Sequence, residues 1–106
     1  MKPVRLSAEA DVELAETAGF YDERQVGLGA AFLSEFVKAA QLIEQFPSSG
    51  RPIGDRMRRI LTNRFPYAII YLEYRDETLV VAIAHTSRRP GYWKNRMTLD
   101  PRSPNH

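Results

Sequence analysis

The sequence predicts an α+β fold in which a short N-terminal strand and a helical hairpin precede a three-stranded antiparallel sheet. Two observations lead to this prediction. Residues 8–45 repeat apolar side chains at helical spacing, whereas residues 57–86 contain three short runs rich in Ile, Val, Leu and Tyr. Because the helical and strand-like patterns do not alternate along the chain, we expect the helices to pack on one face of a mostly antiparallel sheet.

The first half of the chain supplies the short strand and both helices. We expect a strand at residues 4–6, followed by Ser7, which is a favourable capping residue for a helix over residues 8–25. The run Gly27-Leu28-Gly29 is expected to end that helix. An apolar i, i+3, i+4, i+7 stripe then predicts a second helix over residues 30–45. So short a connection favours an antiparallel hairpin.

The second half changes to strand patterning. Residues 51–56 contain Pro52 and Gly54, which predict a loop. Strands are expected over residues 57–65, 67–75 and 78–86, the last two joined by a tight turn. The segment after residue 87 is expected either to close the sheet or to form a short helical turn near Tyr92. One domain therefore spans residues 1–98, and residues 99–106 form a frayed tail.

Composition indicates a single soluble domain. The chain has 106 residues, of which 43% are hydrophobic and 26% charged. The absence of cysteine excludes a disulfide framework and a cysteine nucleophile, and it fits a cytosolic protein. No apolar run resembles a signal peptide or reaches the ~20 residues that span a bilayer. A cytoplasmic location is therefore expected.

The formal net charge of +2 hides an asymmetry. Residues 1–50 hold four Lys or Arg against eight Asp or Glu, a net −4, and residues 51–106 hold eleven against five, a net +6. Twelve of the fifteen basic residues are arginines, whose planar guanidinium groups suit phosphates and carboxylates. The basic half therefore indicates phosphate contacts or an acidic protein partner, with a solvated charged surface as the alternative.

Metal and cofactor chemistry have little support in the sequence. The two histidines, His85 and His106, are far apart, and neither a zinc-type His spacing nor a nucleotide-binding glycine loop is present. We therefore predict no metal site and no cofactor. The carboxylates Glu9, Glu13 and Glu16 are expected to line a solvated helix face.

A cluster of basic and aromatic residues follows the last predicted strand. Its members fall within twelve positions: His85, Arg88, Arg89, Tyr92, Trp93 and Arg96. A proton-transferring histidine, cationic arginines and stacking aromatic rings are the parts of a metal-free ribonuclease. The alternative is structural: a satisfied histidine, and a tryptophan that anchors the tail. Arginines 58, 59 and 64 could likewise contact phosphate or pair with the acidic helices.

Short motifs in a consistent order resemble the RelE/ParE superfamily of bacterial toxins over residues 4–96. The motifs are Ala10-Asp11, Tyr21, Gly27-Leu28-Gly29, Phe32-Leu33, Ile43, Phe46-Pro47, Gly50-Arg51, Phe65-Pro66-Tyr67-Ala68-Ile69-Ile70-Tyr71, Val81-Ala82-Ile83-Ala84-His85, Arg88-Arg89-Pro90-Gly91-Tyr92-Trp93 and Arg96. The resemblance implies the toxin half of a type II toxin–antitoxin pair, usually encoded beside a small antitoxin. It also implies the order of elements predicted above.

Two branches of this superfamily differ in their target. RelE-like members cut mRNA on the ribosome, and for that branch the resemblance implies a catalytic set of His85, Arg59, Arg64, Arg88 and Tyr92. ParE-like members instead poison DNA gyrase. Residues 52–93 contain no lysine, where the best-known ribosome-dependent nucleases carry a pair, and the net charge is low for ribosome docking. These features favour the ParE-like and plasmid-stabilisation branch, with the ribonuclease as the alternative.

Either branch implies a cognate antitoxin as partner. We expect it to bind the basic side of the sheet by helix-in-groove contact, strand addition or both. Arginine and aromatic side chains are typical of such interfaces, and the residues predicted to take part are Arg58, Arg89, Trp93 and Arg96.

Overall fold

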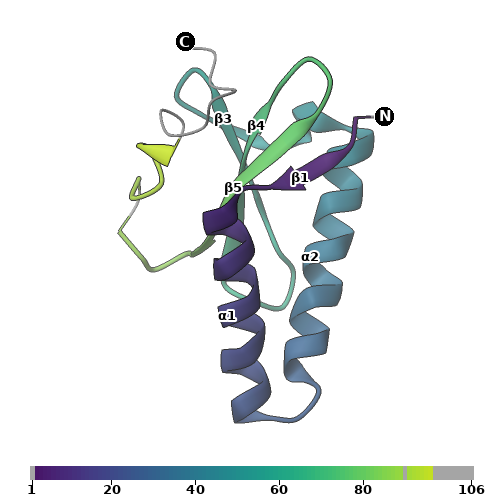
Figure 1. Ribbon diagram of the computed structural model, residues 1–106, viewed down its shortest axis with the longest axis vertical. Helices are drawn as coiled ribbons and strands as arrows, with labels where there is room; N and C mark the ends of the chain where they lie inside the picture. The colour runs from purple at the N-terminus through teal and green to yellow at the C-terminus, as the bar shows by residue number, and fades with distance from the viewer. Residues whose placement is uncertain (1, 90, 97–106) are drawn as a thin grey trace.

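The computed structural model describes residues 2–89 and 91–96, which fold as a helical hairpin against a five-stranded sheet (Figure 1). The elements are β1 (Val4–Leu6), α1 (Ala8–Arg24), α2 (Leu28–Gln45), a 3-10 turn (Pro47–Ser49), β2 (Arg51–Ile53), β3 (Met57–Leu61), β4 (Tyr67–Glu73) and β5 (Thr78–His85). The predicted α+β class and order of elements are confirmed. The predicted domain end at residue 98 and the tail over residues 99–106 lie outside the described residues.

The sheet has more strands than the three predicted for it, because the expected β1 joins it at one edge and the unexpected β2 at the other. Its order is β1-β5-β4-β3-β2, with β1 parallel to β5 and every other pair antiparallel. The prediction of a loop over residues 51–56 is wrong at its start, since β2 pairs with β3. Pro52 is tolerated because β2 is an edge strand, whose outer side needs no backbone donor.

The turn between the helices explains why α2 begins two residues earlier than predicted. Gly27 makes the turn with a positive φ of 89°, and Asp22 Oδ1 accepts hydrogen bonds from the N–H groups of Gly27 (2.9 Å) and Gly29 (3.2 Å). Gly29 lies inside α2, where a Cβ would overlap the Ala18 carbonyl of α1. The glycines therefore permit a tight turn and a close helix crossing (Figure 1).

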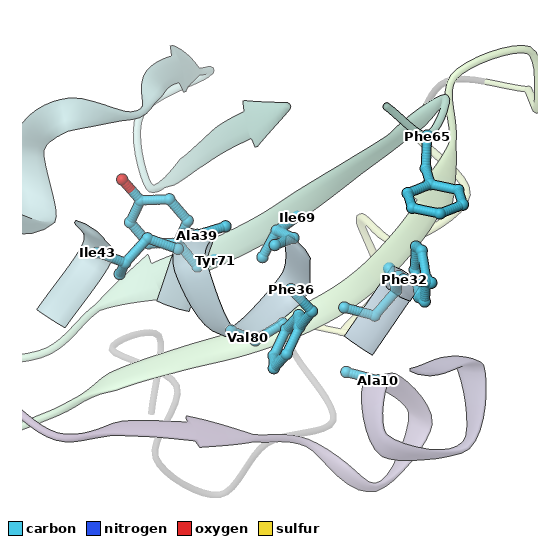
Figure 2. Close-up of a cluster of buried hydrophobic side chains, with 10 residues drawn as sticks. Ala10, Phe32, Phe36, Ala39, Ile43, Phe65, Ile69, Tyr71 and Val80 are labelled. Atoms are coloured by element: carbon cyan, nitrogen blue, oxygen red, sulfur yellow. The ribbon is translucent and has the colours of Figure 1, made fainter. Parts of the chain in front are cut away.

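Both helices pack on one face of the sheet. The buried side chains of this core are Ala10, Phe32, Phe36, Ala39, Ile43, Phe65, Ile69, Tyr71, Val80 and Ile83. Figure 2 shows the ring of Phe32 beside that of Phe65, which it meets edge-on with 5.3 Å between centroids. The hydroxyl of Tyr71 donates to the carbonyl oxygen of Pro47 (2.7 Å) and accepts from the Gly50 N–H (2.9 Å), so this buried polar group is satisfied.

A β-bulge in β5 determines which face each later side chain takes. Ile70 pairs with Ala82 and Tyr71 with Val80, which leaves Val81 as an extra residue. Val81 and Ala82 therefore both join the second apolar cluster, on the face away from the helices. The strand then continues with its alternation reversed. This reversal places the Ile83 side chain in the core that the helices cover.

Candidate functional site

The segment after β5 folds back on the sheet through a short helical turn. The Lys94 N–H donates to the Gly91 carbonyl (3.0 Å) and the Arg96 N–H to the Trp93 carbonyl (2.9 Å). Trp93, only 8% exposed, packs into the cluster on the second face of the sheet. Of the two alternatives predicted for this segment, the helical turn near Tyr92 is confirmed.

Glu13 of α1 is the centre of the hydrogen bonding around this turn. Its Oε1 accepts from the Ile83 N–H and from Arg96 Nη1, both at 2.9 Å. Its Oε2 accepts from the Tyr92 hydroxyl at 2.9 Å and from Arg96 Nη2 at 3.0 Å. The Glu13 and Arg96 side chains are each only 17% exposed. The expectation that Glu13 lines a solvated face is therefore wrong, because it lies one turn along α1 from the fully buried Ala10.

The Glu13–Arg96 ion pair also takes the place of a missing strand. β1 pairs with β5 only as far as Val80. Beyond that point, Arg96 Nη1 donates to the Val81 carbonyl (2.8 Å), and Glu13 accepts from the Ile83 N–H. A carboxylate and a guanidinium thus satisfy edge groups that a longer β1 would have bonded. The edge of β5 is consequently blocked against addition of another strand here.

Tyr92 is held in its neutral form within this cluster. Burial, together with its hydrogen bond to the Glu13 carboxylate, raises the pKa of Tyr92 to about 12. The hydrogen bond to Glu13 likewise raises the pKa of Arg96. The Tyr92 ring is in contact with two guanidinium groups, those of Arg88 (4.2 Å to the ring centroid) and Arg96 (5.0 Å). The site therefore holds a protonated phenol whose proton is already donated.

His85 has a defined hydrogen-bonding arrangement. The Ser87 N–H donates to His85 Nδ1 at 3.1 Å, and Ser87 Oγ lies 2.7 Å from the same nitrogen. A backbone N–H can only donate, so Nδ1 is an acceptor and the neutral ring carries its proton on Nε2. The ring meets Tyr67 edge-on, with 5.1 Å between centroids. His85 Nε2 is thereby a hydrogen-bond donor for whatever approaches the end of β5.

Three of the five residues predicted for catalysis lie together. Arg59, His85 and Arg88 line one small cavity of about 50 Å³, with Trp93 in its wall. Arg64 is not among the residues around this cavity. It lies in the β3–β4 turn with a φ of 72°, and the Cζ atom of its guanidinium is 5.3 Å from the centroid of the Phe65 ring. Tyr92 directs its hydroxyl to Glu13 instead.

The residues predicted for partner binding are divided between internal and open positions. Arg58 donates from Nη1 to the carbonyl oxygens of Gly50 (2.9 Å) and Ser48 (3.3 Å), which ties β3 to the segment after α2. Trp93 and Arg96 are mostly buried, whereas Arg89 is exposed. No arginine of the group 58, 59 and 64 forms an ion pair with the helices in the part of the chain that the structure describes.

The chemistry of this site suits anions. The exposed guanidinium groups of Arg88 and Arg89 can bind a phosphate or a carboxylate. Within residues 2–89 and 91–96, no three side chains of the His, Cys, Asp or Glu type are grouped so as to hold one metal ion. In the same residues, no helix combines the length and the apolar character that crossing a bilayer requires.

Comparison with known proteins agrees with this fold. Residues 4–90 match the family described as the ParE toxin of the type II toxin-antitoxin system parDE. A solved structure titled the chromosomal ParDE TA system from P. aeruginosa is similar, with a TM-score of 0.73 and 15% sequence identity over 82% of this chain and 98% of that chain. No curated protein sequence matches significantly.

The fold and the match together define a toxin of the RelE/ParE superfamily. Within it, the chain belongs to the ParE toxin family of type II toxin–antitoxin systems. The matched residues include Glu13 and His85, whereas Tyr92 and Arg96 lie beyond the end of the match. The partners of Glu13 in the C-terminal turn are therefore read from this structure alone.

Proposed function

We propose that the protein inhibits growth by binding DNA gyrase, without a catalytic step of its own, and that a cognate antitoxin neutralises it. The observation that carries this proposal is the hydrogen bonding of Tyr92 and Arg96 to the Glu13 carboxylate. A general base near neutral pH needs a matched pKa, and Tyr92, with a pKa of about 12, is neutral and already donates to Glu13. Arg96 is bound by the same carboxylate. Membership of the ParE family supports the gyrase branch.

The surface offered to the target is the exposed start of the C-terminal segment. Arg88 and Arg89 are both exposed, and Arg88 lies against the Tyr92 ring, whose hydroxyl is fixed by Glu13. The internal bonds of the cluster therefore hold an exposed cation in place, which lowers the entropy cost of binding. Since gyrase is a cytoplasmic enzyme, the toxin acts on it in the cytoplasm.

The same basic segment is where an acidic part of the antitoxin would bind. The family pairs each toxin with an antitoxin, and the solved relative is titled a toxin–antitoxin system. Arginine beside aromatic side chains is a common composition of interface centres. Binding there would cover the groups that meet the target, which gives a direct route to neutralisation and to plasmid stabilisation.

A second function, a ribosome-dependent mRNA endoribonuclease, is favoured by one observation. Arg59, His85 and Arg88 surround one cavity, and the Nε2–H of His85 is a hydrogen-bond donor for a phosphate there. The two guanidinium groups would then stabilise charge that develops on the phosphate.

Two assays separate these functions. Purified toxin at micromolar concentration should block DNA supercoiling by gyrase and accumulate cleaved DNA, and it should leave translated mRNA uncut in primer extension. Codon-boundary cuts that disappear in both His85→Ala and Arg88→Ala, together with normal supercoiling, would reverse the assignment in favour of the ribonuclease.

A further inference from the structure

A second groove lies away from the C-terminal segment, between α2 and the end of β3. Its volume is about 240 Å³, and it is lined by Glu35, Lys38, Ala39, Leu42, Ile60, Leu61, Thr62 and Asn63. β2 pairs with β3 only as far as Arg59, so Ile60 and Leu61 belong to an open part of the sheet edge. The groove therefore combines a helix flank with a strand that ends beside it.

A buried carboxylate lies in this groove. Glu35 is only 8% exposed, and its Oε2 accepts from Lys38 Nζ at 3.2 Å. The Lys38 side chain is 66% exposed, and so solvated a lysine compensates poorly for a desolvated carboxylate. Among the described residues, no donor reaches Glu35 Oε1. The carboxylate thus has an acceptor oxygen left for a ligand.

The rims of the groove are apolar and open. Leu42 on α2 is 42% exposed and Leu61 on β3 is 55% exposed. Phe46, the residue that follows the end of α2, is also 60% exposed. A buried charge between exposed apolar side chains is the composition of an interface centre rather than of a solvated surface.

We propose that this groove binds a basic, apolar-flanked segment of the antitoxin, whose Arg or Lys inserts between Leu42 and Leu61 and donates to Glu35. The carboxylate supplies the charge complementarity, and the apolar rims match the aliphatic stem of a long basic side chain. Lys38, already exposed, can turn away to solvent. The inference rests on the antitoxin partner proposed above. At Arg88 and Arg89 the toxin offers positive charge to an acidic part of the antitoxin, whereas in this groove it offers negative charge to a basic part.

The test is a calorimetric titration of the toxin with the product of the adjacent open reading frame. Glu35→Gln removes the charge with little change in shape and should weaken binding at least about tenfold, since one member of a buried charged pair is lost. Leu61→Ser should also weaken it. Glu44→Gln makes the same change on the same helix but outside the groove, and its affinity should equal that of wild type. Wild-type affinity in both Glu35→Gln and Leu61→Ser would overturn the inference.

Further measurements keep the outcomes distinct. Thermal unfolding of each variant shows whether it is folded. If Glu35→Gln does not fold, the binding of Leu61→Ser, whose substitution is at an exposed sheet edge, tests the proposal. The antitoxin should contain one basic residue whose change to Ala removes the difference in affinity between wild-type toxin and Glu35→Gln. A wild-type toxin that fails to bind would overturn the antitoxin pairing itself. Sedimentation that shows Glu35→Gln altering self-association would assign the groove to a second copy and contradict the proposal.

Discussion

Single residues determine how the C-terminal segment is held, and Glu13 has the largest share. Its carboxylate accepts hydrogen bonds from Ile83 on β5 and from Tyr92 and Arg96 in the final turn. These groups are 70 to 83 positions away in the sequence. One side chain on α1 therefore connects the helical hairpin, the sheet edge and the proposed target-binding segment.

Removal of the Glu13 charge should destabilise the protein. In Glu13→Gln the mostly buried guanidinium of Arg96 loses its counter-charge, so we expect the free energy of unfolding to fall by about 2 kcal/mol or more. Urea denaturation measures this change. Glu16→Gln, at an exposed position on the same helix, is the matched control and should stay within about 0.5 kcal/mol of wild type. Equal losses in the two variants would contradict the role of Glu13.

The raised pKa of Tyr92 predicts a loss of stability in alkali. The folded state holds the Tyr92 pKa at about 12, above the ordinary value of 10.0, so folding favours the protonated phenol. Its contribution is complete below pH 10 and is lost as the pH rises toward 12. Burial also raises the pKa values of Tyr21 and Tyr71, so their effects have the same sign.

Chemical denaturation from pH 9 to 12 tests this prediction when wild type is compared with Tyr92→Phe. The phenylalanine variant has no phenol to ionise and should lose stability less steeply over this interval. Identical pH profiles for the two proteins would mean that Tyr92 ionises in the folded protein as freely as in the unfolded chain.

At the scale of elements, the sequence was sufficient to predict the two helices and the three central strands. Their apolar periodicities are strong, and the Ser7 cap is confirmed by its hydrogen bond from the Ala10 N–H (3.1 Å). The bulge at Val81 could not be predicted, because every residue from Leu79 to Ala84 is apolar and either alternation fits. β2 was missed because its strand character comes from pairing with β3, which its own three residues do not reveal.

The crossing of α1 and α2 depends on Gly29, and a matched pair of substitutions tests this. In Gly29→Ala the new methyl group would overlap the Ala18 carbonyl, so the helices must separate at a cost of about 1–3 kcal/mol. In Gly19→Ala, on α1, nothing lies within 4 Å of the new methyl group. That variant should gain about 0.5–1 kcal/mol from its helix propensity. Thermal unfolding that ranks the two variants the other way would show that the crossing is not tight.

Over the whole molecule, the acidic first half and the basic second half are joined by ion pairs. In the Glu13–Arg96 pair the acid comes from the first half and the base from the second. In the Lys2–Glu73 and Arg5–Glu77 pairs the base comes from the first half and the acid from the second. Of these three pairs, Glu13–Arg96 joins the charges that each half has in excess, whereas the other two join the charges that each half has fewer of, so the asymmetry of the sequence is not used up by them. The arginines that stay exposed, such as Arg88 and Arg89, are the ones that can meet a partner.

The candidate site was predicted only in part. The resemblance implied that Arg59, His85 and Arg88 belong to one site, and in the fold these three line the same cavity. Glu13 was missed because a carboxylate on an acidic helix normally faces solvent. The burial of Ala10, three residues before Glu13, would have indicated its position, but that burial is known only from the structure. The hydrogen bonds that Tyr92 and Arg96 donate to Glu13 could not be predicted without knowing where Glu13 lies.

The claim that the toxin acts by binding, without catalysis, is tested most directly by its stoichiometry on gyrase. Supercoiling activity is measured at a fixed gyrase concentration while the ratio of toxin to gyrase is raised. We predict that inhibition rises in proportion to the toxin and becomes complete only when the toxin is at least equimolar with its binding sites. Complete inhibition by a small fraction of an equivalent, or none at a large excess, would contradict this account.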